Sequence, residues 1–127
     1  MTSENSVFFE SSKPNPQIPS VEDISPEEVK QKMDLIEIVD VRRPDEWTGE
    51  LGHIPQAKLI VMDNVPQKLS DLPKDKPLVL VCRSGARSAQ TAAFLKLQGF
   101  TSVYNMEGGM IAWNEKNYET AEKNKSS

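Results

Sequence analysis

The sequence has little of two residue types that often carry function: it contains one cysteine and one histidine in 127 residues. A single cysteine cannot form an internal disulfide, and it gives no sign of an oxidising compartment. One Cys and one His are also too few to make up a metal-binding set. We therefore predict no metal site and no other cofactor.

Long apolar runs and an excess of positive charge are also lacking. No apolar stretch reaches membrane-spanning length, and the amino terminus has neither the basic segment nor the apolar core of a signal peptide. The chain has 15 Lys and Arg against 19 Asp and Glu, a formal net charge of −4. This balance provides no general attraction to nucleic acid or to anionic membranes. We therefore expect a cytoplasmic protein with neither of these partners.

The length of the chain suits a single domain with a substantial core. Residues 1–19 are rich in Ser, Asn, Pro and Lys and are predicted to form a flexible tail, and residues 119–127 are predicted to form a second one. The adjacent Phe8 and Phe9 either dock on the domain or stay exposed, and docking is favoured because paired phenylalanines are rarely left in water. The predicted domain spans residues 20–118.

Within this domain, five apolar stretches alternate with segments of helical pattern. The clearest helix start is Ser25, which is followed by Pro26 and Glu28 in an arrangement typical of an N-cap. Strands that alternate with helices through short connections predict an α/β fold, in which a five-stranded, mostly parallel sheet carries helices on both faces. The predicted strands are 19–24, 35–41, 58–62, 78–81 and 101–105.

The lone cysteine, Cys82, lies between the most apolar strand, residues 78–81, and a helix predicted over residues 88–98. Ser88 is a good N-cap for that helix, and Gly99 suits a left-handed position at its end. In parallel α/β sheets, ligands bind outside the carboxyl ends of the strands. The sequence therefore places Cys82 where a binding site is expected.

A cysteine in this position is predicted to be a reactive thiolate. Backbone N–H groups and the helix dipole favour negative charge at a helix amino terminus. Arg83 and Arg87 add positive charge on either side. The alternative, a buried structural cysteine, is the commonest role of an isolated one, but it does not call for two neighbouring arginines.

Residues 82–88 (CRSGARS) resemble the active-site loop of the rhodanese family, the sulfurtransferases that carry sulfur as a cysteine persulfide. Three further segments resemble signatures of that family: 40–47 (DVRRPDEW), 52–57 (GHIPQA) and 106–113 (MEGGMIAW). The four segments occur in the family's order, and the resemblance covers about residues 20–118. It implies a rhodanese-like three-layer domain.

The resemblance also implies a chemistry. Cys82 would take the outer sulfur of a small donor such as thiosulfate or a persulfide, and pass it to cyanide or a thiol, with a protein thiol as a further acceptor. Asp40 and Arg42 would be framework residues near the site. For His53, the only histidine, we expect a turn-stabilising role rather than catalysis, because one His and one Cys make no metal set. The substrate-binding loop would comprise Arg83, Ser84, Gly85, Ala86, Arg87 and Ser88.

Within that loop the roles differ. Arg83 either contacts an anionic donor or is a solvated surface arginine, and these two interpretations remain equal. Arg87 is expected to brace the loop. Ser88 is expected first to cap the helix and only second to bond the transferred sulfur.

Two other functions fit parts of this pattern. A non-catalytic persulfide carrier or interaction module would have the same residues, and a turnover assay distinguishes it from an enzyme. A cysteine phosphatase or arsenate reductase uses a similar strand, loop and helix. However, four residues separate Cys82 from Arg87 here, whereas such phosphatases have five, and the shorter loop suits a sulfur atom better than a tetrahedral phosphate.

Overall fold

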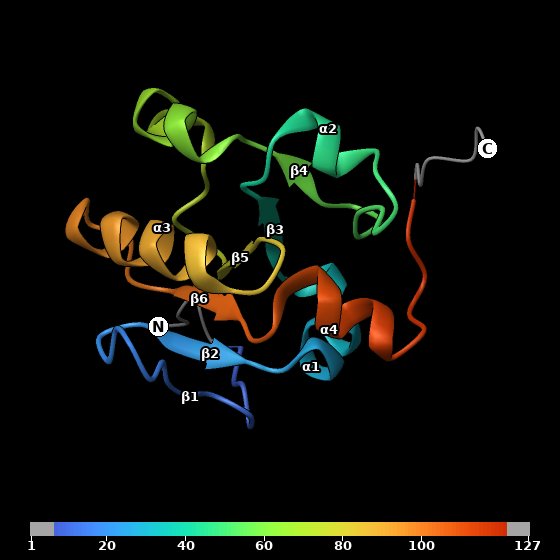
Figure 1. Cartoon of the computed structure of the whole chain (residues 1–127). Coiled ribbons are helices and arrows are strands. Elements are labelled where there is room, and N and C mark those ends of the chain that lie inside the picture. The colour runs from blue at the N-terminus through green and yellow to red at the C-terminus, as the bar shows by residue number, and fades with distance from the viewer. Residues whose placement is uncertain (1–6, 122–127) are drawn as a thin grey trace.

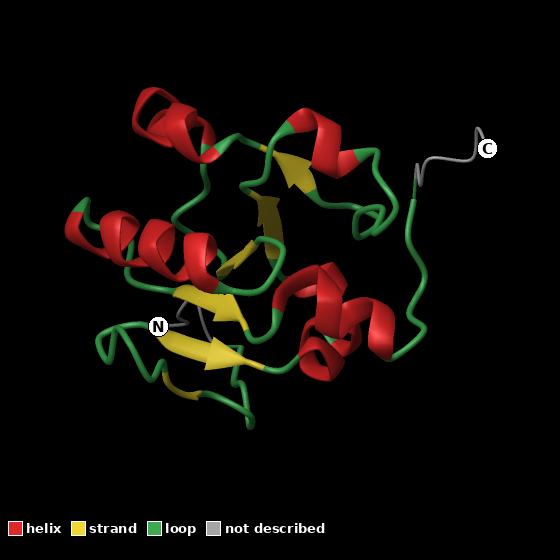
Figure 2. Ribbon diagram, viewed as in Figure 1, coloured by secondary structure: helices red, strands yellow, loops and turns green. Residues whose placement is uncertain are grey.

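The computed structural model describes residues 7–121, which form a six-stranded sheet with helices on both faces (Figures 1 and 2). The order across the sheet is β1-β2-β6-β5-β3-β4, and β1 is antiparallel to β2 whereas the other neighbours are parallel. The strands are β1 (Lys13–Pro14), β2 (Glu22–Ile24), β3 (Glu37–Asp40), β4 (Lys58–Leu59), β5 (Leu78–Val81) and β6 (Val103–Met106). The helices are α1 (Pro26–Gln31), η1 (Met33–Leu35), α2 (Pro44–Trp47), η2 (Met62–Asp71), α3 (Ala86–Leu97) and α4 (Gly109–Glu115), of which η1 and η2 are 3-10 helices. The predicted α/β fold class is confirmed.

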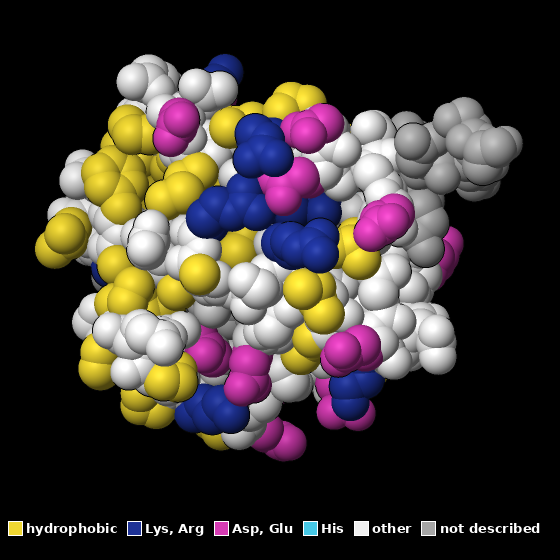
Figure 3. All heavy atoms as spheres, viewed as in Figure 1, with side chains coloured by type: hydrophobic (Ala, Val, Ile, Leu, Met, Phe, Trp, Pro, Cys, Tyr) yellow, Lys and Arg dark blue, Asp and Glu magenta, His cyan; other side chains and the backbone are white. Residues whose placement is uncertain are grey.

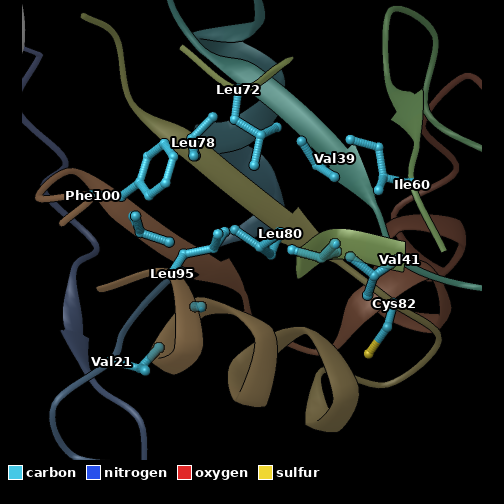
Figure 4. Packing of buried hydrophobic residues seen from close by; sticks show 13 residues of the cluster. Val21, Val39, Val41, Ile60, Leu72, Leu78, Leu80, Cys82, Leu95 and Phe100 are labelled. Atoms are coloured by element: carbon cyan, nitrogen blue, oxygen red, sulfur yellow. The ribbon is translucent and has the colours of Figure 1, made fainter. Parts of the chain in front are cut away.

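The central strand β5 is buried on both faces because all four of its residues are apolar. Leu78 and Leu80 lie in a core cluster shared with residues of α3 and η2, part of which is shown in Figure 4. Val79 and Val81 lie in a second cluster, with residues of α1 and α4. Because both faces of the strand are covered, its carboxyl end is held firmly, and Cys82 follows directly.

Helix α1 begins as predicted from the sequence. The Ser25 side chain accepts a hydrogen bond from the backbone N–H of Glu28 at 3.1 Å, and Pro26 occupies the first helical position. The N–H groups of the first turn are thereby partly satisfied, and the missing N–H of proline leaves no donor unpaired there.

The sheet has one strand more than predicted, and the extra strand lies in the segment expected to be a flexible tail. Residues 7–19 form an arm that contains β1 and runs along one edge of the sheet (Figure 1). Phe9 is buried, with its ring centroid 4.7 Å from that of Tyr104. Phe8 remains 73% exposed. Of the two phenylalanines, Phe9 therefore docks on the domain and Phe8 does not.

The arm is also held by a buried carboxylate of α1. Glu28 accepts hydrogen bonds from the backbone N–H groups of Glu10 and Ser11, at 2.8 and 2.9 Å, and it pairs with Lys32. Burial raises the pKa of Glu28, but the hydrogen bonds from Lys32, Ser11 and Glu10 outweigh this and lower it to about 2. Such side-chain-to-backbone contacts have no periodic pattern, which is why they could not be predicted from the sequence.

Near the other end of the chain, Ala121 pairs with His53 in an isolated antiparallel bridge. The remaining parts of the two predicted tails, residues 1–6 and 122–127, lie outside the described residues. In residues 7–121 no helix combines the length and the apolar character needed to cross a bilayer.

Candidate active site

The cysteine lies at the carboxyl end of β5, where the chain turns into α3. Its side chain is 1% exposed, and its sulfur points towards the start of α3 (Figure 4). Behind the loop, the backbone N–H groups of Met110 and Ile111 donate to the carbonyl oxygens of Cys82 and Arg83, at 2.8 and 3.0 Å. The first turn of α4 therefore holds the backbone of the loop in place.

Hydrogen-bond donors surround the sulfur on the α3 side. The backbone N–H groups of Gly85 and Ser88 donate to Cys82 Sγ, with N···S distances of 3.1 and 3.3 Å. The Ser88 hydroxyl oxygen lies 3.2 Å from the same sulfur. Donors aimed at one atom stabilise it in its anionic form. The loop is therefore suited to a thiolate or to a sulfur anion carried on it.

The start of α3 differs from the prediction that Ser88 caps the helix. The cap is Gly85, whose φ of 106° allows the backbone to turn directly into a helix that begins at Ala86. Ser88 therefore lies within the first turn and is fully buried, with its hydroxyl close to the sulfur. Gly99 ends the helix as predicted, with a φ of 97°, and the N–H of Phe100 donates to the carbonyl oxygen of Leu95.

Arg87 is bound by an acidic residue of α2. Both of its terminal nitrogens donate to the Glu46 carboxylate, each at 2.9 Å. The hydrogen bond from Arg87 lowers the pKa of Glu46 to about 2, against the opposing effect of burial, and the same bond raises the pKa of Arg87. The two residues are 41 positions apart, and no local pattern in the sequence pointed to Glu46.

This ion pair leads to a prediction about acid stability. Glu46 has a pKa of about 2 in the folded protein, against an ordinary value of 4.5, so its stabilising effect is complete above pH 4.5 and is lost as the pH falls towards 2. Glu46→Gln is expected to lower the free energy of unfolding by about 1–2 kcal/mol at pH 7. The difference between variant and wild type should shrink by pH 3, as measured by urea unfolding at both pH values.

The exposed neighbour Asp45 provides a matched control. Its side chain is 74% exposed and pairs with the exposed Arg43, so Asp45→Asn should leave the unfolding free energy within about 0.5 kcal/mol of wild type. Glu28, which also has a lowered pKa, is present in every variant and cancels from the differences. A Glu46→Gln effect of equal size at pH 7 and pH 3 would contradict the assignment.

Asp40 and Arg42 form a buried ion pair at the end of β3. Each side chain is 1% exposed, and Arg42 Nε and Nη2 donate to the two carboxylate oxygens of Asp40 at 2.9 and 2.8 Å. Arg42 Nη2 also donates to the carbonyl oxygen of Gly52 at 2.7 Å. The pair thus joins the end of β3 to the turn that contains His53.

His53 packs against Trp47. Its ring stacks on that of Trp47, with centroids 3.5 Å apart and planes 9° from parallel, and its Nδ1 lies 3.1 Å from the Trp47 carbonyl oxygen. Throughout residues 7–121, no group of three or more His, Cys, Asp or Glu side chains is arranged to hold a metal ion.

The outer side of the loop is positively charged. Lys and Arg side chains gather on the face near α2 and the N-terminal end of α3 (Figure 3). Arg83 is exposed, and together with Arg42 and Glu46 it lines a small cavity of about 60 Å³. Residues 84–86 line a second hollow of about 360 Å³, on the side of the loop that faces the arm.

Asn105, a buried polar residue of β6, belongs to the site but was not predicted from the sequence. Its amide oxygen lies 2.5 Å from the Ser88 hydroxyl oxygen, and its amide nitrogen donates to Asp23 of β2 at 2.9 Å. The signal available in the sequence was one polar residue within the otherwise apolar segment 103–106.

Comparison with known proteins identifies the family of the chain. A sulfurtransferase of Allochromatium vinosum is 42% identical over 96 residues, which is 73% of this chain and 88% of that protein. The putative sulfurtransferase YtwF of Bacillus subtilis is 45% identical over 96 residues, 73% of this chain and 90% of that protein. A crystal structure of a rhodanese-related protein from Thermoplasma volcanium superposes with a TM-score of 0.73 at 27% identity, covering 80% of this chain and 98% of that one. The family model of the rhodanese-like domain matches residues 25–116, and this chain therefore belongs to the rhodanese-like family.

Proposed function

We propose that the protein transfers a sulfane sulfur from a small anionic donor to a nucleophilic acceptor, and that Cys82 carries the sulfur as a persulfide. The observation that carries this proposal is the position of Cys82 Sγ, which accepts hydrogen bonds from the backbone N–H groups of Gly85 and Ser88. These donors are fixed by the loop, so they stabilise the sulfur anion without having to reorganise during the reaction.

In the first step, the Cys82 thiolate attacks the outer sulfur of thiosulfate. A bond forms between the two sulfurs, and sulfite leaves with the electron pair of the bond that breaks. The persulfide keeps one negative charge, and the loop donors face that charge. Arg83, an exposed residue of the loop, provides a positive charge for a dianionic donor.

In the second step, cyanide or a thiolate attacks the outer sulfur of the persulfide. The new bond forms to the acceptor, the Cys82 sulfur leaves with the electron pair, and the thiolate is regenerated. Neither step requires a general base. Asp40 and Arg42 are paired with each other, and the His53 ring stacks on Trp47.

The loop supports sulfur chemistry more strongly than phosphate chemistry. Both terminal nitrogens of Arg87 are bound to Glu46, so its guanidinium is not available to hold a phosphoryl group above Cys82. Four residues separate Cys82 from Arg87, one fewer than in cysteine phosphatases.

The experiment is a turnover assay with thiosulfate and cyanide, in which thiocyanate is measured over time for wild type and for Cys82→Ser. An enzyme forms many equivalents of thiocyanate per chain, and Cys82→Ser forms none above background. A single equivalent, released from sulfur already on Cys82 with no reloading from thiosulfate, would replace the proposal by a persulfide carrier that other proteins load. Equal rates in wild type and Cys82→Ser would refute both.

A further inference from the structure

A line of buried polar side chains leads from the active-site sulfur across the sheet to the arm. It runs from Ser88, 0% exposed, through Asn105 and Asp23, 1% and 3% exposed, to Asn15, 6% exposed. Ser88 Oγ lies 3.2 Å from Cys82 Sγ and 2.5 Å from Asn105 Oδ1. Asn105 Nδ2 and Asn15 Nδ2 donate to Asp23 Oδ1, at 2.9 and 3.0 Å.

The Ser88 hydroxyl has one proton and two acceptors within reach. It cannot donate to the cysteine sulfur and to the Asn105 oxygen at the same time. The orientation of the Asn105 amide decides between them. An ionised carboxylate accepts hydrogen bonds only, so the amide nitrogen must face Asp23 and the amide oxygen must face Ser88. Asn105 Oδ1 therefore competes with the sulfur for the Ser88 proton, and two oxygens in contact need a proton between them.

We propose that Asn105, oriented by Asp23, is a positioning residue that turns the Ser88 hydroxyl proton away from the Cys82 sulfur. The sulfur anion then accepts hydrogen bonds from the two backbone N–H groups of the loop and not from the hydroxyl. An anion with fewer donors is a stronger nucleophile, because the nucleophilicity of thiolates rises with their basicity. This set of side chains, Asp23, Asn105 and Ser88, is called the relay. It lowers the stabilisation of the thiolate and raises its reactivity.

The inference rests on the proposed function only in making Cys82 the nucleophile. Its test measures alkylation of the thiol and needs no sulfur transfer, so the two can fail separately. An Asn105 substitution leaves the charged groups around the loop unchanged, whereas an Asp23 substitution removes one of them and is therefore read only against the Ser88→Ala background. These groups are Arg83 in the loop, the Arg87–Glu46 and Arg42–Asp40 pairs, and Asp23 and Glu107 in the hollow that residues 84–86 line.

The experiment measures the rate of Cys82 alkylation by iodoacetamide as a function of pH. In Asn105→Leu the Ser88 hydroxyl is free to donate to the sulfur anion. The pH of half-maximal rate is expected to fall by about one unit, the effect of one added hydrogen bond to a charged group. The plateau rate at high pH is expected to fall about threefold, because a less basic thiolate is less nucleophilic.

Repeating the measurement in a Ser88→Ala background isolates the relay. Without the hydroxyl, Asn105→Leu should cause no further shift of the half-maximal pH. The same pair of measurements is made for Asp23→Asn, which frees the Asn105 amide to turn but also removes a charge. The effect of the lost charge on the half-maximal pH persists in the Ser88→Ala background, whereas the effect of the relay does not. This second cycle decides the question if Asn105→Leu does not fold.

A matched control comes from the arm. Asn15→Ala removes a donor to Asp23 but leaves the contact between Asn105 and Ser88, so it should not shift the alkylation profile. A downward shift that is present with Ser88 and absent in the Ser88→Ala background supports the relay. No shift with Ser88 in place, or equal shifts in both backgrounds, would overturn it.

Discussion

Replacing Gly109 by alanine is expected to abolish most of the activity of the Cys82 loop. A Cβ at this position would lie 2.4 Å from the Cys82 carbonyl oxygen and 2.5 Å from the Arg83 carbonyl carbon. Both are backbone atoms of the loop, so relief requires the loop itself to move. The φ of 58° at Gly109 adds strain for any side chain.

The expected loss has two components. The displaced loop breaks the bonds from Met110 and Ile111 to the carbonyls of Cys82 and Arg83, and overpacking with strain should lower the free energy of unfolding by about 3 kcal/mol. A shift of about 1 Å at the sulfur should lower the rate of sulfur transfer about a hundredfold. Urea unfolding and the thiocyanate assay measure the two components.

Gly99→Ala is the matched control. Gly99 also has a positive φ, of 97°, but the atom nearest to a Cβ added there would be the flexible end of Lys74, at 3.7 Å. Its replacement should therefore lower stability by about 1 kcal/mol and leave sulfur transfer intact. Equal losses of stability in the two variants, with activity kept in both, would show that the approach of α4 to the loop is unimportant.

The largest loss of stability is expected from Arg42→Met. The change leaves the Asp40 carboxylate buried without its partner and removes the donor to the Gly52 carbonyl. Breaking a buried pair from one side costs about 3–5 kcal/mol, since an uncompensated charge remains. Urea unfolding at pH 7 measures this loss directly.

Two further variants test the reason for that loss. Arg43→Met removes the neighbouring arginine, which is 63% exposed, and should change the unfolding free energy by less than about 1 kcal/mol. Adding Asp40→Asn to Arg42→Met removes the uncompensated charge and should recover part of the stability. If the double variant is no more stable than Arg42→Met, desolvated charge is not the cause.

The sequence predicted those parts of the fold that have a local pattern. The correct fold class followed from three such patterns: the run of apolar residues in β5, the cap at Ser25 and the alternation of strands with helices. Five of the six strands were predicted in place. The start of α3 was predicted too late in the chain, because the capping preference of Ser88 suggested a cap that the positive φ of Gly85 supplies instead. The arm was missed because individual side chains, such as Phe9 and Glu28, hold it rather than a repeating pattern.

The residues that complete the site depend on contacts between distant parts of the chain. Cys82 and its loop were accessible from sequence because they are consecutive and carry a recognisable combination of residues. Glu46 reaches Arg87 from 41 positions away, and Asn105 reaches Ser88 from 17 positions away. Gly109 approaches the loop as closely as it does only because α4 packs behind it. These pairings follow from the order of strands in the sheet, which local patterns do not specify.

The most direct test of sulfur transfer through Cys82 is the intact mass of the protein after incubation with thiosulfate and removal of the donor. Cys82 is the only cysteine in the chain, so no other thiol competes for the sulfur. Wild type is predicted to gain the mass of one sulfur atom, to release one equivalent of sulfite, and to lose the added mass on treatment with cyanide. Cys82→Ser is predicted to gain nothing. A wild-type protein that stays unmodified, or a serine variant that gains the same mass, would contradict the account.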